Sequence, residues 1–169
     1  MAGITHIALG LAVGRLYAGR PSLGASLVFA GLSFLPDVDF IGHVLGVPYA
    51  SAFGHRGATH SLVFAAGVGL IGGCVERWRN GGGLRAAGFV GLTVASHPLL
   101  DALTTGGLGV ALLWPWSEER FFAPVRPIPV SPMGLGVFTA RGLRVMAAEA
   151  LPSLILALLA RMPARGGRV

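Results

Sequence analysis

The sequence predicts an all-α protein: an integral membrane helix bundle of about four to five spanning helices, forming a single domain over residues 1–169. Hydrophobic residues make up 53% of the chain and charged residues only 12%, about half the charged fraction of a soluble domain. The apolar residues gather in five stretches whose lengths approach the roughly 20 residues that cross a bilayer. All thirteen basic residues are arginines that never form a basic run, so nucleic acid is not an expected partner.

The five stretches cover residues 4–19, 23–41, 59–75, 84–103 and 145–160. In the first, Arg15 and Arg20 follow the apolar core instead of preceding it, so a cleaved signal peptide is not expected. The third contains glycines that would let membrane helices approach closely: Gly67, Gly69, Gly72 and Gly73. It also contains Cys74, the single cysteine, expected as a buried small side chain. The last stretch is short and contains Glu149 and Pro152, which count against a spanning helix.

Residues 104–142 separate the fourth and fifth stretches. Their apolar part, 108–116, is too short to cross a bilayer. We therefore expect an interfacial or re-entrant element here, with Trp114 and Trp116 at the level of the lipid headgroups.

The arginines predict the orientation of the bundle. Five spans with the N-terminus outside place eight arginines on the cytoplasmic side and five on the other side, as the positive-inside rule requires. The eight are Arg15, Arg20, Arg77, Arg79, Arg85, Arg161, Arg165 and Arg168. The chain is thus expected to cross a membrane several times.

On this topology seven ionisable side chains converge at the outer ends of the helices. An Asp at the centre of a membrane helix costs about 2.5–3.5 kcal/mol on insertion scales, so such residues are seldom kept without a use. The seven are His6, Asp37, Asp39, His55, His60, His97 and Asp101. They are the predicted metal ligands.

The residue types indicate which metal to expect. His97 and Asp101 are four residues apart, and therefore lie on one face of a helix. Imidazoles and carboxylates without a thiolate suit zinc, with manganese or iron as alternatives, and an Asp can bridge two ions about 3.5–4 Å apart. The alternative is that these groups only hydrogen-bond to one another as packing elements. His43 has no partner at helical spacing and is expected to be an interfacial side chain outside the site.

Other polar residues near these positions have candidate roles. Arg56 lies between two of the histidines, where a guanidinium can hold phosphate oxygens in bidentate fashion; the alternative is an arginine facing the headgroups. Arg120 and Arg126 are further, weaker candidates for substrate binding. The short hydroxyl side chains are expected as helix-terminal caps: Thr59, Ser61, Thr104 and Thr105.

Four sequence blocks together resemble the signature of the YdjM family of membrane-bound metal-dependent hydrolases from bacteria and archaea, one of which is described as LexA-binding. The blocks are Thr5-His6, Pro36-Asp37-Val38-Asp39, His55-Arg56-Gly57-Ala58-Thr59-His60-Ser61 and His97-Pro98-Leu99-Leu100-Asp101-Ala102-Leu103-Thr104. They occur in the family's order and cover about residues 1–116, and residues 113–117 resemble the segment that follows the last motif.

The resemblance implies a location, a bacterial or archaeal inner membrane that the chain crosses several times, and an activity. The family is thought to be similar to zinc-dependent phospholipase C and P1 nuclease, all-helical enzymes that hydrolyse phosphoesters on zinc. By that similarity, an Asp of the Pro36 block, a His of the His55 block, His97 and a bridging Asp101 hold one ion, and His6 helps hold a second. No histidine follows His97, so one or two ions are expected instead of three.

We therefore expect a metal-dependent hydrolase in which metal-activated water attacks a phosphoester, with a membrane lipid headgroup as the nearest source of substrate. One of Asp37 and Asp39 would be a ligand and the other a ligand or general base, and Arg56 would steady substrate charge. A non-catalytic membrane tether for a regulatory protein partner is the alternative. A metal transporter is disfavoured, because the cytoplasmic halves of the helices offer almost no polar path.

Overall fold

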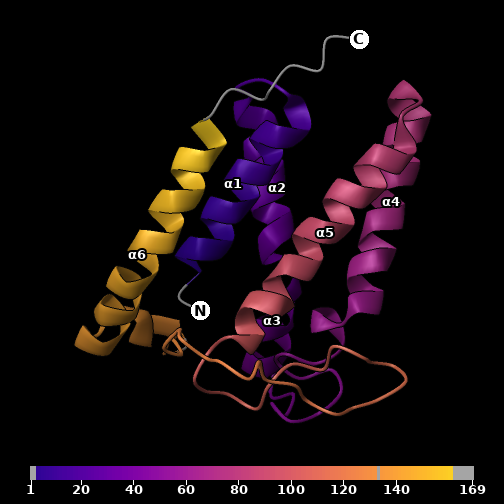
Figure 1. Ribbon diagram of the computed structural model, residues 1–169. Helices are drawn as coiled ribbons and strands as arrows, with labels where there is room; N and C mark the ends of the chain where they lie inside the picture. The colour runs from indigo at the N-terminus through magenta and orange to yellow at the C-terminus, as the bar shows by residue number, and fades with distance from the viewer. Residues whose placement is uncertain (1–2, 133, 162–169) are drawn as a thin grey trace.

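A computed structural model describes residues 3–132 and 134–161, and within them every regular element is a helix, which confirms the all-α prediction (Figure 1). The long helices are α1 (Ile4–Ala18), α2 (Leu23–Phe34), α4 (Leu62–Asn80), α5 (Gly83–Ala102) and α6 (Ala140–Arg161). The short ones are η1 (Leu35–Val38), α3 (Asp39–Val44), η2 (Ala58–His60) and η3 (Gly134–Phe138).

The helix ends follow local sequence chemistry. Ser22 and Ser61 cap α2 and α4, each accepting a hydrogen bond from the backbone N–H three residues later. α1 and α4 end at Gly19 and Gly81, whose left-handed backbone (φ 64° and 83°) suits glycine. The predicted continuous stretch 23–41 is interrupted. α2 ends at Phe34, because Pro36 cannot donate a backbone hydrogen bond, and the chain continues as η1 from Leu35.

Glycines pack the helices into two close pairs, α1 with α2 and α4 with α5. A Cβ atom on Gly10 or Gly14 would lie 2.5 Å from a backbone oxygen of α2. A Cβ on Gly69 would lie 2.8 Å from the Ala87 oxygen of α5. The predicted role of the α4 glycines is thus confirmed for Gly69, Gly72 and Gly73, which all pack against α5, whereas Gly67 faces open space. α6 lies along the other side of α1 (Figure 1).

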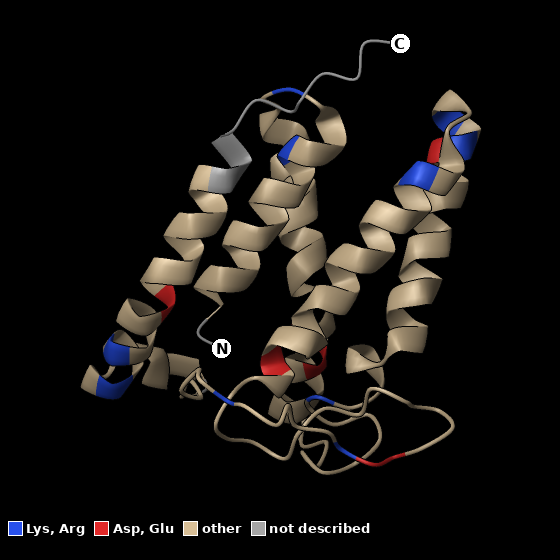
Figure 2. Ribbon diagram, viewed as in Figure 1, with Lys and Arg blue, Asp and Glu red and all other residues tan. Residues whose placement is uncertain are grey.

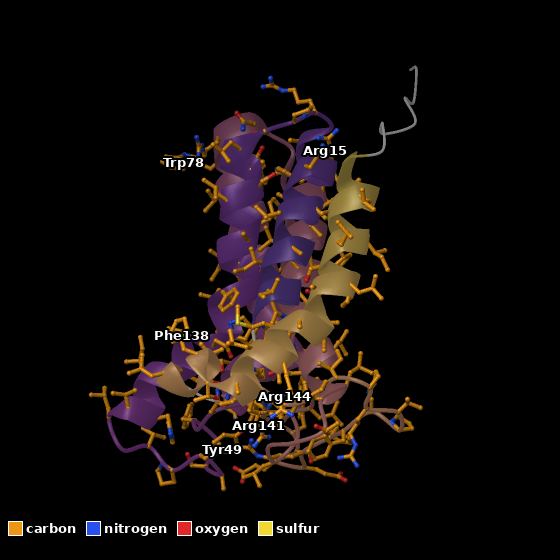
Figure 3. The ribbon with its side chains drawn as sticks, turned by 90° about the vertical axis from the view of Figure 1, so that its left-hand side faces the viewer. Arg15, Tyr49, Trp78, Phe138, Arg141 and Arg144 are labelled. Atoms are coloured by element: carbon orange, nitrogen blue, oxygen red, sulfur yellow. The ribbon has the colours of Figure 1, made fainter. Side chains whose placement is uncertain are left out.

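All the long connections lie at one end of the bundle, together with α3 and η2 (Figure 1). We call it the loop end; it contains residues 45–61 and 103–139. The opposite turn end holds the two tight connections, α1 to α2 and α4 to α5. Charged residues gather near the two ends and leave most of the helix length between them uncharged (Figure 2). Arg15 lies at the turn end, and Arg141 and Arg144 lie at the loop end (Figure 3).

Residues 104–142 are mostly irregular and lie at the loop end, held by two isolated β-bridges, Thr104 with Ile128 and Val110 with Phe121. Their last residues already belong to α6, which is longer than the expected 145–160 and continues through Pro152. Arg165 and Arg168 lie outside the described residues. Cys74, expected to be buried, is exposed, because the α4 face that packs on α5 is formed by Gly69, Gly72 and Gly73 instead.

Among the described residues, one helical stretch is long and apolar enough to cross a bilayer by itself: Leu23–Val44, which comprises α2, η1 and α3. α1 is apolar but shorter. The expected number of four to five spans stays a prediction.

Candidate metal centre

The seven predicted ligands come from five segments of the chain and meet at the loop end. η1 supplies Asp37, α3 supplies Asp39, and α1 supplies His6 from its first turn. His55 and His60 come from the loop before α4, and His97 and Asp101 come from the end of α5. Five of the seven are buried: His6, Asp39, His60, His97 and Asp101.

Four of these residues form one compact group. Asp37, His60, His97 and Asp101 each offer a ligand atom, and all four atoms lie within 4.8 Å of one another. Asp37 Oδ1 lies 3.2 Å from His97 Nε2 and 3.5 Å from His60 Nε2. Asp101 Oδ2 lies 3.8 Å from each of the same two nitrogens. In a tetrahedral zinc site, with bonds of about 2.0–2.1 Å, neighbouring ligand atoms lie about 3.3–3.4 Å apart. The four residues therefore fit a zinc-sized cation.

The two histidines of this group are oriented by their other ring nitrogen. His97 Nδ1 lies 2.7 Å from the backbone oxygen of Ser33. A carbonyl can only accept, so Nδ1 carries the proton, and a neutral ring then has its lone pair on Nε2. His60 Nδ1 lies 3.0 Å from Asp39 Oδ2, while its buried Nε2 has no hydrogen-bond partner among the described residues. Metal-bound histidines typically have this outer hydrogen bond to a carbonyl or carboxylate.

The environment of His60 favours positive charge. Burial by itself lowers the pKa of this imidazole, but the neighbouring carboxylates of Asp37 and Asp39 outweigh it and raise the pKa to about 9. The site thus stabilises a cation at this position.

Asp39 is surrounded by donors and organises the loop. Its Oδ1 lies 2.7 Å from His55 Nδ1. Its Oδ2 accepts hydrogen bonds from the Thr59 hydroxyl (2.7 Å) and the Arg56 backbone N–H (3.1 Å). Asp39, His55 and His60 form the second group of ligand atoms close enough for an ion. Because each Asp39 oxygen already has a partner, this carboxylate is best placed to orient the histidines.

His6 lies beside the four-residue group and outside it. Its ring stacks on that of His97, with centroids 3.8 Å apart. Its Nε2 lies 3.7 Å from Asp101 Oδ1, the carboxylate oxygen that does not face His60 and His97. Neither ring nitrogen of this buried residue has a hydrogen-bond partner among the described residues.

Arg56 is buried against Asp101. Its Nε lies 3.1 Å from Asp101 Oδ2, and its Nη1 donates to the Thr104 hydroxyl and the Gly106 carbonyl. The Thr104 hydroxyl donates in turn to the Asp101 carbonyl at the end of α5, as expected of a cap. Arg56 itself has a left-handed backbone (φ 65°), which directs the chain from His55 towards His60.

The other predicted residues lie apart from the cluster. Arg120 donates to the backbone oxygens of His55, Tyr49 and Ser51, so it holds the loop in place. Arg126 is exposed and stacks over the Phe122 ring. His43 packs against Phe40 and Tyr49 and belongs to neither metal-binding group, as predicted.

A cavity of about 600 Å³ opens beside the cluster. Its polar wall contains Asp37, His55, Arg56 and Asp101. Its apolar wall includes Phe34, Phe40, Val130, Pro132 and Val137. Sequence reasoning did not identify the apolar wall or the carbonyl of Ser33, because neither has a recognisable spacing relative to the ligands.

The chain matches proteins that are named for the bacterial inner membrane. A model of the YdjM inner membrane protein family matches residues 1–166. The inner membrane protein YbcI of Escherichia coli is 48% identical over 141 residues, 80% of each chain. The inner membrane protein YdjM of the same organism is 39% identical over 100 residues, which are 54% of this chain and 48% of that relative. No solved structure matches, and the expected similarity to phospholipase C and P1 nuclease stays a prediction.

Proposed function

The chain belongs to the YdjM inner membrane protein family, and from this premise we propose that it is a metal-dependent hydrolase of phosphoesters at the membrane surface. The observation that carries the proposal is the pair of buried histidines, His60 and His97. In both residues Nε2 faces the carboxylates of Asp37 and Asp101. In both, Nδ1 faces an acceptor outside the four-residue group, the Asp39 carboxylate or the Ser33 carbonyl.

The proposed first site consists of Asp37, His60, His97 and Asp101. Zinc is the preferred ion and manganese the alternative. Such an ion supplies Lewis acidity to a phosphoryl oxygen and lowers the pKa of a water to about 7. A second ion would lie between Asp101 Oδ1 and His6, whose ring nitrogens have no other partner.

The remaining polar residues have supporting roles in this proposal. Asp39 orients His55 and His60 through hydrogen bonds to both rings. Arg56 holds Asp101 and lines the cavity, where its cationic group would favour a phosphate. Arg120 is not assigned to the substrate, because three backbone oxygens already use its guanidinium.

We also propose that α1, α2, α4, α5 and α6 cross the inner membrane with the loop end outside. The up-and-down order of these helices supports the crossings. The sequence-based assignment of eight of the thirteen arginines to the cytoplasmic side supports the orientation. The active site would then lie at the outer surface, beside the phospholipid headgroups.

The proposal is tested by metal analysis and hydrolysis assays on the detergent-purified protein. Wild-type protein should bind zinc or manganese stoichiometrically, and chelation should lower its melting temperature, because a ligand specific to the folded state stabilises it. Asp101→Asn keeps the side-chain shape but removes a charge that balances the cation. It should fold and lose at least about tenfold in hydrolysis of phosphomonoesters and phosphodiesters in micelles.

His43→Ala is the matched control, because His43 lies outside both metal-binding groups, and it should leave metal content and activity unchanged. Equal activity in wild type and Asp101→Asn would contradict the catalytic assignment. Bound metal without hydrolysis of any substrate in the panel would favour a non-catalytic tether.

A further inference from the structure

A second cavity, of about 410 Å³, lies between α1, α5 and α6. We call it the α1–α5 groove. Its lining has no charged residue: Leu9, Ala12, Val13, Leu16, Phe89, Leu92, Thr93, Ser96 and Leu156. Most of these side chains are hydrocarbon, so the groove suits an apolar occupant.

The groove lies between α1 and α5, which belong to different close pairs and whose side-chain rings meet near its two ends. At the turn end, Tyr17 packs on Phe89 with ring centroids 5.4 Å apart, and the Arg85 guanidinium covers both rings. At the loop end, the rings of His6 and His97 stack. Between these contacts α1 presents the small Ala12, which leaves the space open.

The few polar atoms of the groove have partners within their own helix. The Thr93 hydroxyl donates to the Phe89 carbonyl, and the Ser96 hydroxyl donates to the Thr93 carbonyl. These two hydroxyls therefore need no hydrogen bond from an occupant of the groove. A polar ligand that displaced lipid from the groove would gain no hydrogen bond there.

The groove also has the position and length of an acyl-chain site. Its residues Leu9 to Leu16 rise about 10.5 Å along α1, about two thirds of the hydrocarbon depth of one leaflet of a bilayer about 30 Å thick. Leu9 is one turn from His6, and Ser96 directly precedes His97. A hydrocarbon chain in the groove would thus begin beside the candidate metal site and extend into the membrane.

We infer that the α1–α5 groove holds a hydrocarbon chain of a phospholipid whose phosphate lies at the proposed metal site. This inference rests on the proposed function and names its substrate class. Bilayer lipid is as apolar as the groove, so occupancy adds little affinity. Occupancy of the groove instead favours substrates with long hydrocarbon chains, because a chain held there positions the phosphoester at the proposed metal site.

The test fills the groove and follows the lipid directly. Ala12→Phe places a ring inside the groove. Leu92→Trp, at a 74% exposed position on the rim of the groove, narrows its opening and replaces the first variant if that one misfolds. Leu70→Trp is the matched control, at a 66% exposed position on α4 away from the groove. None of the three positions is a proposed metal ligand, so metal content should not change.

Two readouts are used. Phosphatidylglycerol with a diazirine in its acyl chain is photolysed in nanodiscs, and adducts should be several-fold more frequent on the lining residues of α1 and α5 than on the exposed face of α4. In micelles, filling the groove should lower hydrolysis of dipalmitoyl relative to dihexanoyl phosphatidylglycerol by about tenfold, or about 1.4 kcal/mol of transition-state binding.

The two readouts separate this inference from the proposed function. Adducts spread evenly over all helices would contradict lipid binding in the groove, whether or not the protein is an enzyme. An unchanged ratio of long-chain to short-chain hydrolysis in both filled variants would also overturn it. No hydrolysis of either lipid, with adducts still concentrated in the groove, would count against the hydrolase alone and leave the lipid site supported.

Discussion

The orientation of each imidazole is decided by its second nitrogen. At His97 the acceptor is the Ser33 carbonyl at the end of α2, and at His60 it is the Asp39 carboxylate in α3. Each outer contact leaves Nε2 directed at Asp37 and Asp101. Ligands held in advance lose little conformational freedom when an ion binds, so these outer contacts should affect metal affinity nearly as strongly as the ligands do.

Asp39→Asn separates orientation from ligation. The amide is nearly isosteric with the carboxylate but accepts more weakly from His60, so metal affinity should fall by about 10–100-fold. The number of ions bound at saturation should not change, as isothermal titration would show. His97→Ala serves as the comparison, since it removes a proposed ligand and should abolish binding at the first site. Loss of an ion at saturation in Asp39→Asn would instead make Asp39 a ligand.

Metal affinity should increase with pH. The metal-free His60 has a raised pKa of about 9 and is protonated at pH 7, so an ion that binds Nε2 must displace one proton. The apparent dissociation constant should therefore fall about tenfold per pH unit from pH 7 towards 9 and then level off. Titrations in buffers of different ionisation enthalpy should detect about one proton released at pH 7. Affinity that is constant between pH 7 and 9 would contradict this.

At the scale of the elements, small residues determine which helices approach closely. The glycines of α1 and α4 bring backbones together within each close pair, whereas α1 and α5 meet mainly through side chains. Association of helices in a membrane depends on such packing, because lipid removes most of the hydrophobic driving force. The same asymmetry leaves the α1–α5 groove between the pairs.

Gly14→Ala should destabilise the α1/α2 pair. The added Cβ would lie 2.5 Å from the Ala25 backbone oxygen, which cannot move without shifting α2. We expect a loss of about 1–3 kcal/mol of unfolding free energy, measured by thermal melting in detergent. Gly31→Ala is the control in α2, since its Cβ meets no atom within 4 Å and alanine favours the helix. Equal melting of the two variants would show that the close approach does not matter.

At the scale of the whole molecule, the two ends of the bundle differ in chemistry. The loop end contains the candidate metal site and its cavity, and the turn end contains Arg15, Arg20, Arg77, Arg79 and Arg85. The uncharged length between them would lie in the hydrocarbon of the bilayer (Figure 2).

Cysteine labelling tests this orientation in a Cys74→Ala background, which removes the single native thiol. Glu119→Cys, exposed at the loop end, should react with a membrane-impermeant maleimide added to intact cells. Asn80→Cys, exposed at the turn end, should react only after the inner membrane is permeabilised. If Asn80→Cys reacted in intact cells and Glu119→Cys only after permeabilisation, the loop end would face the cytoplasm. Labelling of both sites in intact cells would contradict a membrane-spanning bundle.

Several features of this protein follow from the sequence alone. Composition and periodicity predict the helices, because hydrophobicity and chain entropy act locally along the chain. The spacing of His97 and Asp101 likewise places both on one face of α5. The order of the apolar stretches also predicts that all seven candidate side chains lie at one end of the bundle, where the structure places them.

Only the tertiary structure separates the candidate ligands from the residues that orient them. Asp37 and Asp39 are equivalent in sequence, yet one faces two histidine Nε2 atoms and the other is surrounded by donors from the loop. Likewise, Arg56 pairs with a carboxylate 45 positions away, and the groove depends on which helices belong to the same close pair. These outcomes depend on contacts between segments distant in sequence, and no local pattern encodes which groups meet until the helices have packed.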